Sequence, residues 1–72
     1  MKTYRYKGFA FRSTSSTHAN TGRTLYEVDD MKPAETRPFL TSIRDACEFI
    51  RDAVNLGYWI DGAGRTHNTP QH

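Results

Sequence analysis

The first 23 residues carry five basic side chains and no carboxylate. Their types suggest contact with nucleic acid, since Lys and Arg neutralise the phosphates of DNA and RNA. Some DNA-binding proteins place such residues on strands that lie in the major groove. A small DNA-binding regulator is therefore one hypothesis, and its candidate contacts are Lys2, Arg5, Lys7, Arg12 and Arg23.

The sign of the charge reverses directly afterwards. Residues 24–36 carry four carboxylates and one lysine, a net charge of −3, while the whole chain has a net charge of +2. If this segment pairs antiparallel with the basic strand, Glu27 and Asp29 share an outer face with the arginines, and opposite charges on facing strands stabilise one another. We therefore expect this face of the sheet to be neutralised internally. A weaker positive charge would remain at Lys2, at Arg23 and in the loop of residues 13–22 between the strands.

Patterns for catalysis and metal binding are weak. His67 and His72 have the spacing of half a zinc site, but no residues supply the other half. The lone Cys47 falls on the apolar side of an expected helix and forms no intramolecular disulfide. Acid–base catalysis by the carboxylates of residues 27–30 would need a desolvated cleft, for which 72 residues leave little room. We expect no enzyme, no metal and no cofactor.

Two adjacent aromatic residues suggest a protein interface. In an extended segment Tyr58 and Trp59 point to opposite sides, so that one ring completes the core and the other stays partly exposed. Exposed Trp and Tyr anchor many protein interfaces. The alternative is that both rings cover the open end of the helix and sheet. The candidate partner interface consists of Tyr58, Trp59, Glu27, Asp29 and Asp30.

The first element that must position these residues is a strand over residues 3–12, where aromatic and polar side chains alternate. The aromatic positions change from even (4 and 6) to odd (9 and 11) at Gly8. A β-bulge at Lys7-Gly8 would place all four rings on one face, and this is our prediction. A two-residue hairpin turn at the same site is the alternative.

Polar and breaker residues divide the segment that follows. Residues 13–22 contain no large apolar side chain and are expected to form a mobile loop. Residues 23–29 predict a second strand, with Tyr26 and Val28 facing inward. Residues 37–41 predict a short third strand at a sheet edge, because Pro38 cannot donate a ladder hydrogen bond.

A helix is the strongest local prediction. Ser42 precedes Asp45 by three residues in the manner of a capping box, and Gly57 suits the left-handed position after the last turn. The residues with helical spacing that we expect on its buried side are Ile43, Ala46, Cys47, Phe49, Ile50, Ala53 and Val54.

Together these elements predict an α+β domain over residues 1–64, a three-stranded antiparallel sheet with one helix packed on its aromatic face (βββα). Residues 58–60 are expected as a short fourth strand or an apolar clasp, and residues 65–72 as a flexible tail.

No segment has the length of a membrane span or the apolar core of a signal peptide, so we expect a cytoplasmic protein. A core this small usually needs a disulfide, a metal or a partner, which favours association with another protein or with a second copy.

Three segments carry a resemblance to small accessory proteins of bacteriophages and prophages: YKGF at 6–9, GRTLYEVDD at 22–30, and RPFLTS at 37–42 leading into the helix. The resemblance implies a βββα module in the bacterial cytoplasm that binds and disables or redirects a host protein, as anti-CRISPR and other anti-defence proteins of this size do. It implies no residue-level site.

The layout is also similar to that of integrase arm-binding domains and plant ethylene-response factors, through Tyr4-Arg5 and through Thr41-Ser42 opening the helix. The acidic second strand departs from these DNA readers. The leading hypothesis is thus a non-enzymatic accessory protein that inhibits a host defence or nucleic-acid-handling complex by protein–protein contact. The alternative is the DNA-binding regulator.

Overall fold

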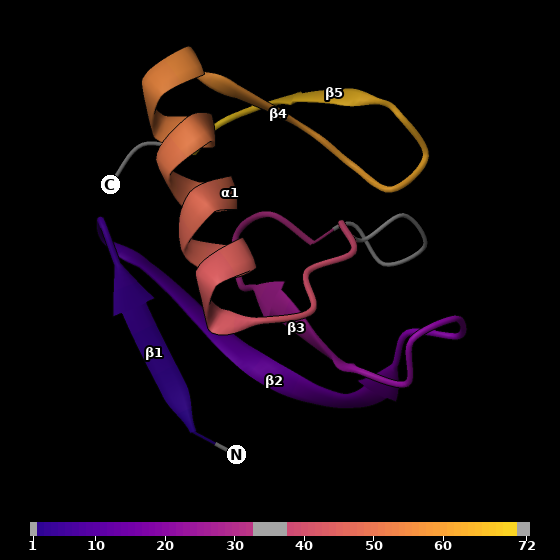
Figure 1. The fold of residues 1–72 in the computed structure, drawn as a ribbon. Coiled ribbons are helices and arrows are strands. Elements are labelled where there is room, and N and C mark those ends of the chain that lie inside the picture. Colours follow the sequence, from indigo (N-terminus) through magenta and orange to yellow (C-terminus); the bar gives the residue numbers. More distant parts are fainter. Residues whose placement is uncertain (1, 33–37, 71–72) are drawn as a thin grey trace.

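The computed structural model describes residues 2–32 and 38–70, and it has the α+β composition that the sequence predicts (Figure 1). A three-stranded antiparallel sheet has the order β1-β2-β3, and a separate two-stranded sheet pairs β4 with β5. The one helix in this part of the chain lies between β3 and β4 in the sequence. The elements are β1 (Thr3–Tyr6), β2 (Phe9–Thr17), β3 (Thr24–Val28), α1 (Ile43–Leu56), β4 (Tyr58–Ile60) and β5 (Thr66–Asn68).

The expected bulge in the first strand is wrong, and the alternative hairpin is what forms. Lys7 and Gly8 both have positive φ, 49° and 86°, and Tyr6 pairs with Phe9 across the turn. Two successive left-handed residues make the kind of turn whose twist matches that of antiparallel strands. Tyr4 lies opposite Phe11, so the hairpin also gathers all four rings on one face and explains the change of phase in the sequence.

The three strands of the sheet are not the three that the sequence predicts. Residues 13–17, expected in a loop, continue β2 and pair with β3 across an irregularity between Ser13 and Thr17. The expected strand 37–41 is reduced, within its described residues, to a single bridge in which the Tyr26 N–H donates to the Leu40 carbonyl at 2.7 Å. Residue 37 lies outside the described residues. The hydroxyl-rich segment forms a strand because β3 supplies partners, among them the Leu25 carbonyl, which accepts from Thr14 Oγ1.

The helix begins and ends where the sequence predicts. Ser42 Oγ accepts from the Asp45 N–H at 3.0 Å, and Gly57, at φ 79°, donates its N–H to the Ala53 carbonyl. The Asp45 carboxylate accepts from the N–H and Oγ1 of Thr41, one residue earlier than a standard capping box requires. The buried stripe is narrower than expected, because Ile43 and Val54 at its ends are exposed.

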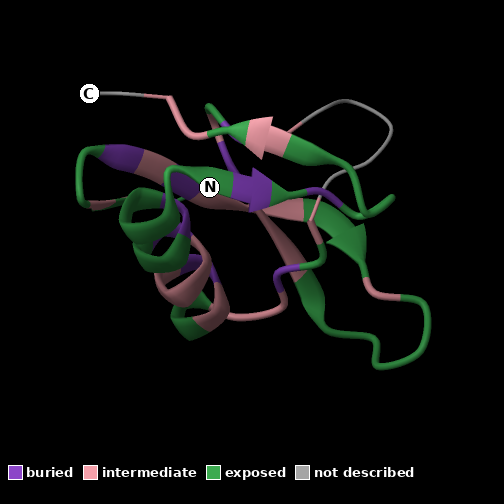
Figure 2. Ribbon diagram, turned by 90° about the horizontal axis from the view of Figure 1, so that it is seen from above, coloured by how far each residue is buried: buried purple, intermediate pink, exposed green. Residues whose placement is uncertain are grey.

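One cluster of buried side chains joins the larger sheet, the helix and β4 (Figure 2). Phe11 and Ile50 are almost completely buried at its centre. Tyr4, Tyr6, Tyr26, Cys47 and Phe49 pack against its margin and stay partly exposed. The buried members are Phe9, Phe11, Val28, Met31, Leu40, Ala46, Ile50, Ala53 and Trp59.

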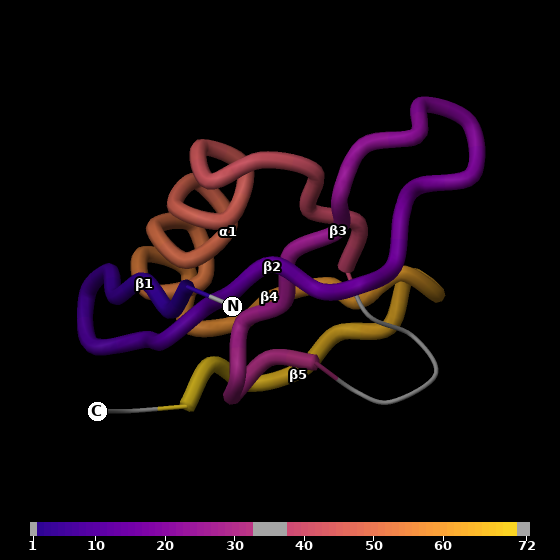
Figure 3. Tube along the Cα trace, turned by 90° about the horizontal axis from the view of Figure 1, so that it is seen from below, coloured from indigo at the N-terminus to yellow at the C-terminus, as the bar shows by residue number. Residues whose placement is uncertain are grey.

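The expected short strand 58–60 forms as β4, but it pairs outside the main sheet. Its partner β5 comes from residues 66–68, which we expected in a flexible tail (Figure 3). Trp59 lies opposite His67, and this pairing brings the last described residues back toward the helix, where Thr69 Oγ1 donates to the Ala53 carbonyl at 2.7 Å. The described part of the chain contains no helix long and apolar enough to cross a membrane.

Candidate functional site

The C-terminal half of α1 and strand β4 enclose a groove of about 240 Å³, named here the α1–β4 groove. The helical residues lie three or four positions apart and therefore share one face. Gly57 then turns the chain directly from helix to strand, which sets β4 beside that face. The lining residues are Phe49, Asp52, Ala53, Leu56, Tyr58, Trp59 and Ile60.

Three large side chains of the groove are unusually exposed. Leu56 is 60% exposed, Ile60 53% and Tyr58 41%. Because side chains alternate along a strand, Tyr58 and Ile60 share the outer side of β4 while Trp59 points to the core. The expectation that one ring of the adjacent pair is buried and the other partly exposed is confirmed. Grouped apolar side chains of this kind are typical of a contact surface.

Trp59 links the groove to the core. It is 6% exposed, its ring meets Phe49 edge to face at 5.7 Å, and it stacks on His67 at 4.5 Å between ring centroids. Its indole N–H is buried and has no hydrogen-bond partner among the described residues. A buried donor without an acceptor is costly, and this N–H is closed off from the surface in the described structure.

Asp61 and His67 form a side-chain contact between the end of β4 and β5. The Asp61 side chain is 1% exposed, and its Oδ1 accepts from the N–H groups of Ala63 and Arg65 at 2.9 and 3.0 Å. Its Oδ2 lies 2.6 Å from His67 Nε2. From the sequence we expected His67 in a flexible tail and Asp61 only in a turn. The Asp-Gly pair at 61–62 is a turn signal that indicates such side-chain-to-backbone bonds.

The structure does not bring the acidic part of the predicted interface to the groove. Glu27 and Asp29 belong to β3 and the turn after it, in the other sheet. Arg12 pairs with Asp29, and Lys32 Nζ lies 3.3 Å from Glu27 and 3.6 Å from Asp29. The expected cross-strand neutralisation is confirmed at Arg12. The exposed Asp30 follows on the same turn and also has an interaction partner.

The five predicted nucleic-acid contacts are likewise separated. Lys2, Arg5 and Lys7 lie on and around β1 and are exposed. Arg12 instead forms an ion pair with Asp29. Arg23 precedes β3 at the loop from β2, which Figure 3 shows at the opposite end of the molecule from the Lys7-Gly8 turn.

Comparisons with protein families, with curated proteins and with solved structures find no match for this chain. The site therefore has to be interpreted from its own geometry. Within residues 2–32 and 38–70, no three His, Cys, Asp or Glu side chains gather in a group that could hold a metal ion. His18 instead packs against Phe39 at 5.7 Å, and Cys47 is a partly buried free thiol. We therefore take the α1–β4 groove as the candidate site within the described residues.

Proposed function

We propose that this protein is a non-enzymatic binding module that recognises another protein through the α1–β4 groove. The observation that carries the proposal is the exposure of Leu56, Tyr58 and Ile60 around a buried tryptophan. Interfaces concentrate their binding energy in such apolar and aromatic anchors.

The kind of partner follows from the sequence resemblance. We propose a host protein, within a defence or nucleic-acid-handling complex, that a phage or prophage accessory protein binds and disables in the bacterial cytoplasm. A helix packed on the aromatic face of the sheet would provide the rigid support. The shared cluster of Phe9 and Phe11 with Ala46, Ile50 and Ala53 supports this part of the proposal.

The test compares capture of partners from a bacterial lysate by the wild type, by Ile60→Asp and by Phe39→Asp. Phe39 is 66% exposed and lies outside the groove, so Phe39→Asp places the same charge on another exposed apolar position and serves as the matched control. We expect Ile60→Asp to lose at least about nine-tenths of any partner that the wild type enriches, because a charge would be buried in the contact. Equal recovery by all three proteins would exclude the groove as the binding surface.

A further inference from the structure

Some cations of the described chain form ion pairs and others do not, and Arg23 and Arg65 belong to the unpaired ones along with three residues at β1. Arg12, Lys32, Arg44 and Arg51 each form an ion pair with a carboxylate on β3, the turn after it or the helix. Lys2, Arg5 and Lys7 are exposed, and no described carboxylate pairs with any of them. We name these three residues, all in or next to β1, the basic edge. Its charge is therefore not cancelled within the described structure, unlike that of the sheet face beside it.

The shape of the hairpin fixes the basic edge in space. β1 is an edge strand of its sheet, and the tight turn at Lys7-Gly8 sets the course of the chain at its end. Lys2 and Lys7 flank the four residues of β1, which span about 13 Å at the rise of a β-strand. Arg5 points to the opposite side of the strand from Tyr4 and Tyr6.

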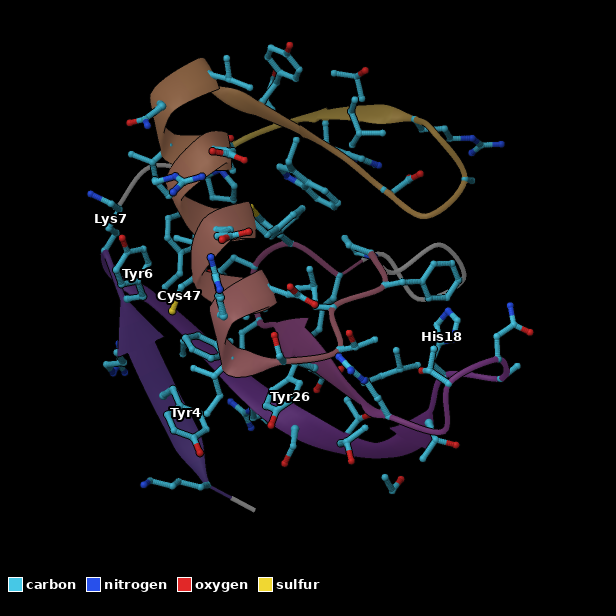
Figure 4. All side chains as sticks on the ribbon, in the orientation of Figure 1. Tyr4, Tyr6, Lys7, His18, Tyr26 and Cys47 are labelled. Atoms are coloured by element: carbon cyan, nitrogen blue, oxygen red, sulfur yellow. The ribbon has the colours of Figure 1, made fainter. Side chains whose placement is uncertain are left out.

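Tyr4 and Tyr6, which fall between Lys2 and Lys7 in the sequence, project from the same side of β1 (Figure 4). Tyr4 stacks on Phe11 with ring centroids 5.3 Å apart, and it is partly exposed, as is Tyr6. Lys2 Nζ lies 5.2 Å from the Tyr4 ring and Lys7 Nζ 5.6 Å from the Tyr6 ring. Alternation of basic and aromatic side chains along one groove or strand is how many proteins hold single-stranded nucleic acid, with phosphates on the cations and bases against the rings.

We propose that the basic edge binds the phosphate backbone of single-stranded nucleic acid, with Tyr4 and Tyr6 in contact with bases. This surface shares Arg5 with the sheet face that the sequence suggested, but it does not include Arg12, which is paired with Asp29. It is also separate from the α1–β4 groove, none of whose lining residues comes from the hairpin. Positive charge on an edge strand can also serve only to prevent edge-to-edge association of sheets. The experiment must distinguish this role of the basic edge from nucleic-acid binding.

The experiment measures fluorescence anisotropy of a labelled single-stranded oligo(dT) of about 12 nucleotides, and of a duplex of the same length, over about 50 to 200 mM salt. We expect the wild type to bind oligo(dT) more tightly than the duplex, with a slope of log K against log salt of roughly −2 for three phosphate contacts. The triple variant Lys2→Gln, Arg5→Gln, Lys7→Asn should bind at least about tenfold more weakly at low salt and show a slope near zero. Asn replaces Lys7 because it tolerates positive φ.

The matched control removes the same number of charges elsewhere, in the variant Arg44→Gln, Arg51→Gln, Arg65→Gln, and should retain oligo(dT) affinity within about threefold. Far-UV circular dichroism checks the fold of each variant. No binding by the wild type at low salt, or an equal loss in both triple variants, would overturn the proposal. Binding that favours the duplex and is unchanged in Tyr4→Leu, Tyr6→Leu would overturn the single-strand assignment. Ile60→Asp should leave oligo(dT) binding intact, which keeps this result independent of the groove.

Discussion

At the scale of single residues, Trp59 and its two neighbours in space decide how the groove is built. The ring is fixed between Phe49 and His67, and His67 is in turn held by the buried carboxylate of Asp61. The Asp61 carboxylate is 1% exposed and also accepts two backbone N–H groups. Substitution of Asp61 should therefore destabilise the fold more than substitution of His67. Loss of its oxygens leaves buried donors without acceptors, which costs more than the bonds themselves contribute.

We predict that Asp61→Ala lowers the free energy of unfolding by about 2–4 kcal/mol, because the N–H groups of Ala63 and Arg65 and the His67 ring lose their shared acceptor. Asp61→Asn, which keeps one oxygen, should cost less than half as much. Urea denaturation followed by Trp59 fluorescence measures both. Asp52→Ala is the control, since Asp52 is exposed and paired only with exposed Arg51, and it should change stability by less than about 0.5 kcal/mol. Equal losses at both positions would contradict this role of Asp61.

At the scale of elements, the structure depends on two short turns whose residues need positive φ, at Lys7-Gly8 and at Gly57. The Lys7-Gly8 turn requires two left-handed residues, and Lys7 adopts such a φ at a cost that Asn or Gly would reduce. Gly57 has the same role at the end of α1, where it directs the chain into β4 and so sets the wall of the groove. Both sites allow a prediction in which the change acts on the backbone and not on packing.

Lys7→Asn is expected to raise the free energy of unfolding by up to about 1 kcal/mol, because Asn-Gly is the preferred pair for this turn. Chemical denaturation at fixed pH measures the change. A lower stability for Lys7→Asn than for Lys7→Val would contradict the turn geometry, since a β-branched residue is the least suited to positive φ. The comparison also separates the charge of Lys7 from its conformation, because both variants remove the charge.

Gly57→Ala is expected to lower the free energy of unfolding by about 1 kcal/mol. No atom lies within 4 Å of the position that an added Cβ would take, so the loss would reflect backbone strain at φ 79° and not a clash. Ala63→Gly, in the turn between β4 and β5, is the control, because Ala63 does not have a positive φ. It tests whether any substitution near this end of the molecule lowers the free energy of unfolding. Thermal unfolding compares the two, and an unchanged midpoint for Gly57→Ala would contradict the strain argument.

At the scale of the whole molecule, a 72-residue chain with one cysteine must stabilise its fold without an internal disulfide. The described core contains nine buried apolar residues, while Leu56, Tyr58 and Ile60 remain exposed over roughly half of their surface. Small cores of this kind seldom supply more than about 3–5 kcal/mol. In our proposal, a partner that covers the α1–β4 groove would add the stability that so small a core lacks.

We therefore predict a free energy of unfolding of about 3–5 kcal/mol for the isolated monomer at 25 °C. Denaturation at several protein concentrations, with light scattering after size exclusion, measures stability and mass together. If a second copy covers the groove, the melting temperature should rise with concentration for the wild type and stay constant for Ile60→Asp. A concentration-independent monomer with a high melting temperature would show that the fold needs no partner.

Local patterns in the sequence determined the features whose causes lie within a few residues. The limits of α1 follow from Ser42 and Gly57, and the opposite burial of Tyr58 and Trp59 follows from strand alternation. Four rings on one face follow from the spacing around Gly8, whether the chain bulges or turns there. These interactions span at most one turn of helix or a few residues of strand, so the order of residue types is enough to predict them.

Only the tertiary structure decided the features that depend on residues far apart in the chain. At Lys7-Gly8 the chain turns instead of bulging, and the two short strands that the turn leaves are supported by pairing along the sheet, where β2 extends to Thr17 and also pairs with β3. Residues 66–68 became a strand because Trp59 and Asp61 provide a stack and a hydrogen bond for His67, which has no apolar pattern around it to predict this. The charge of Arg12 was neutralised by Asp29 while that of Lys2, Arg5 and Lys7 was not, since strand order places the carboxylates beside β2 and away from β1.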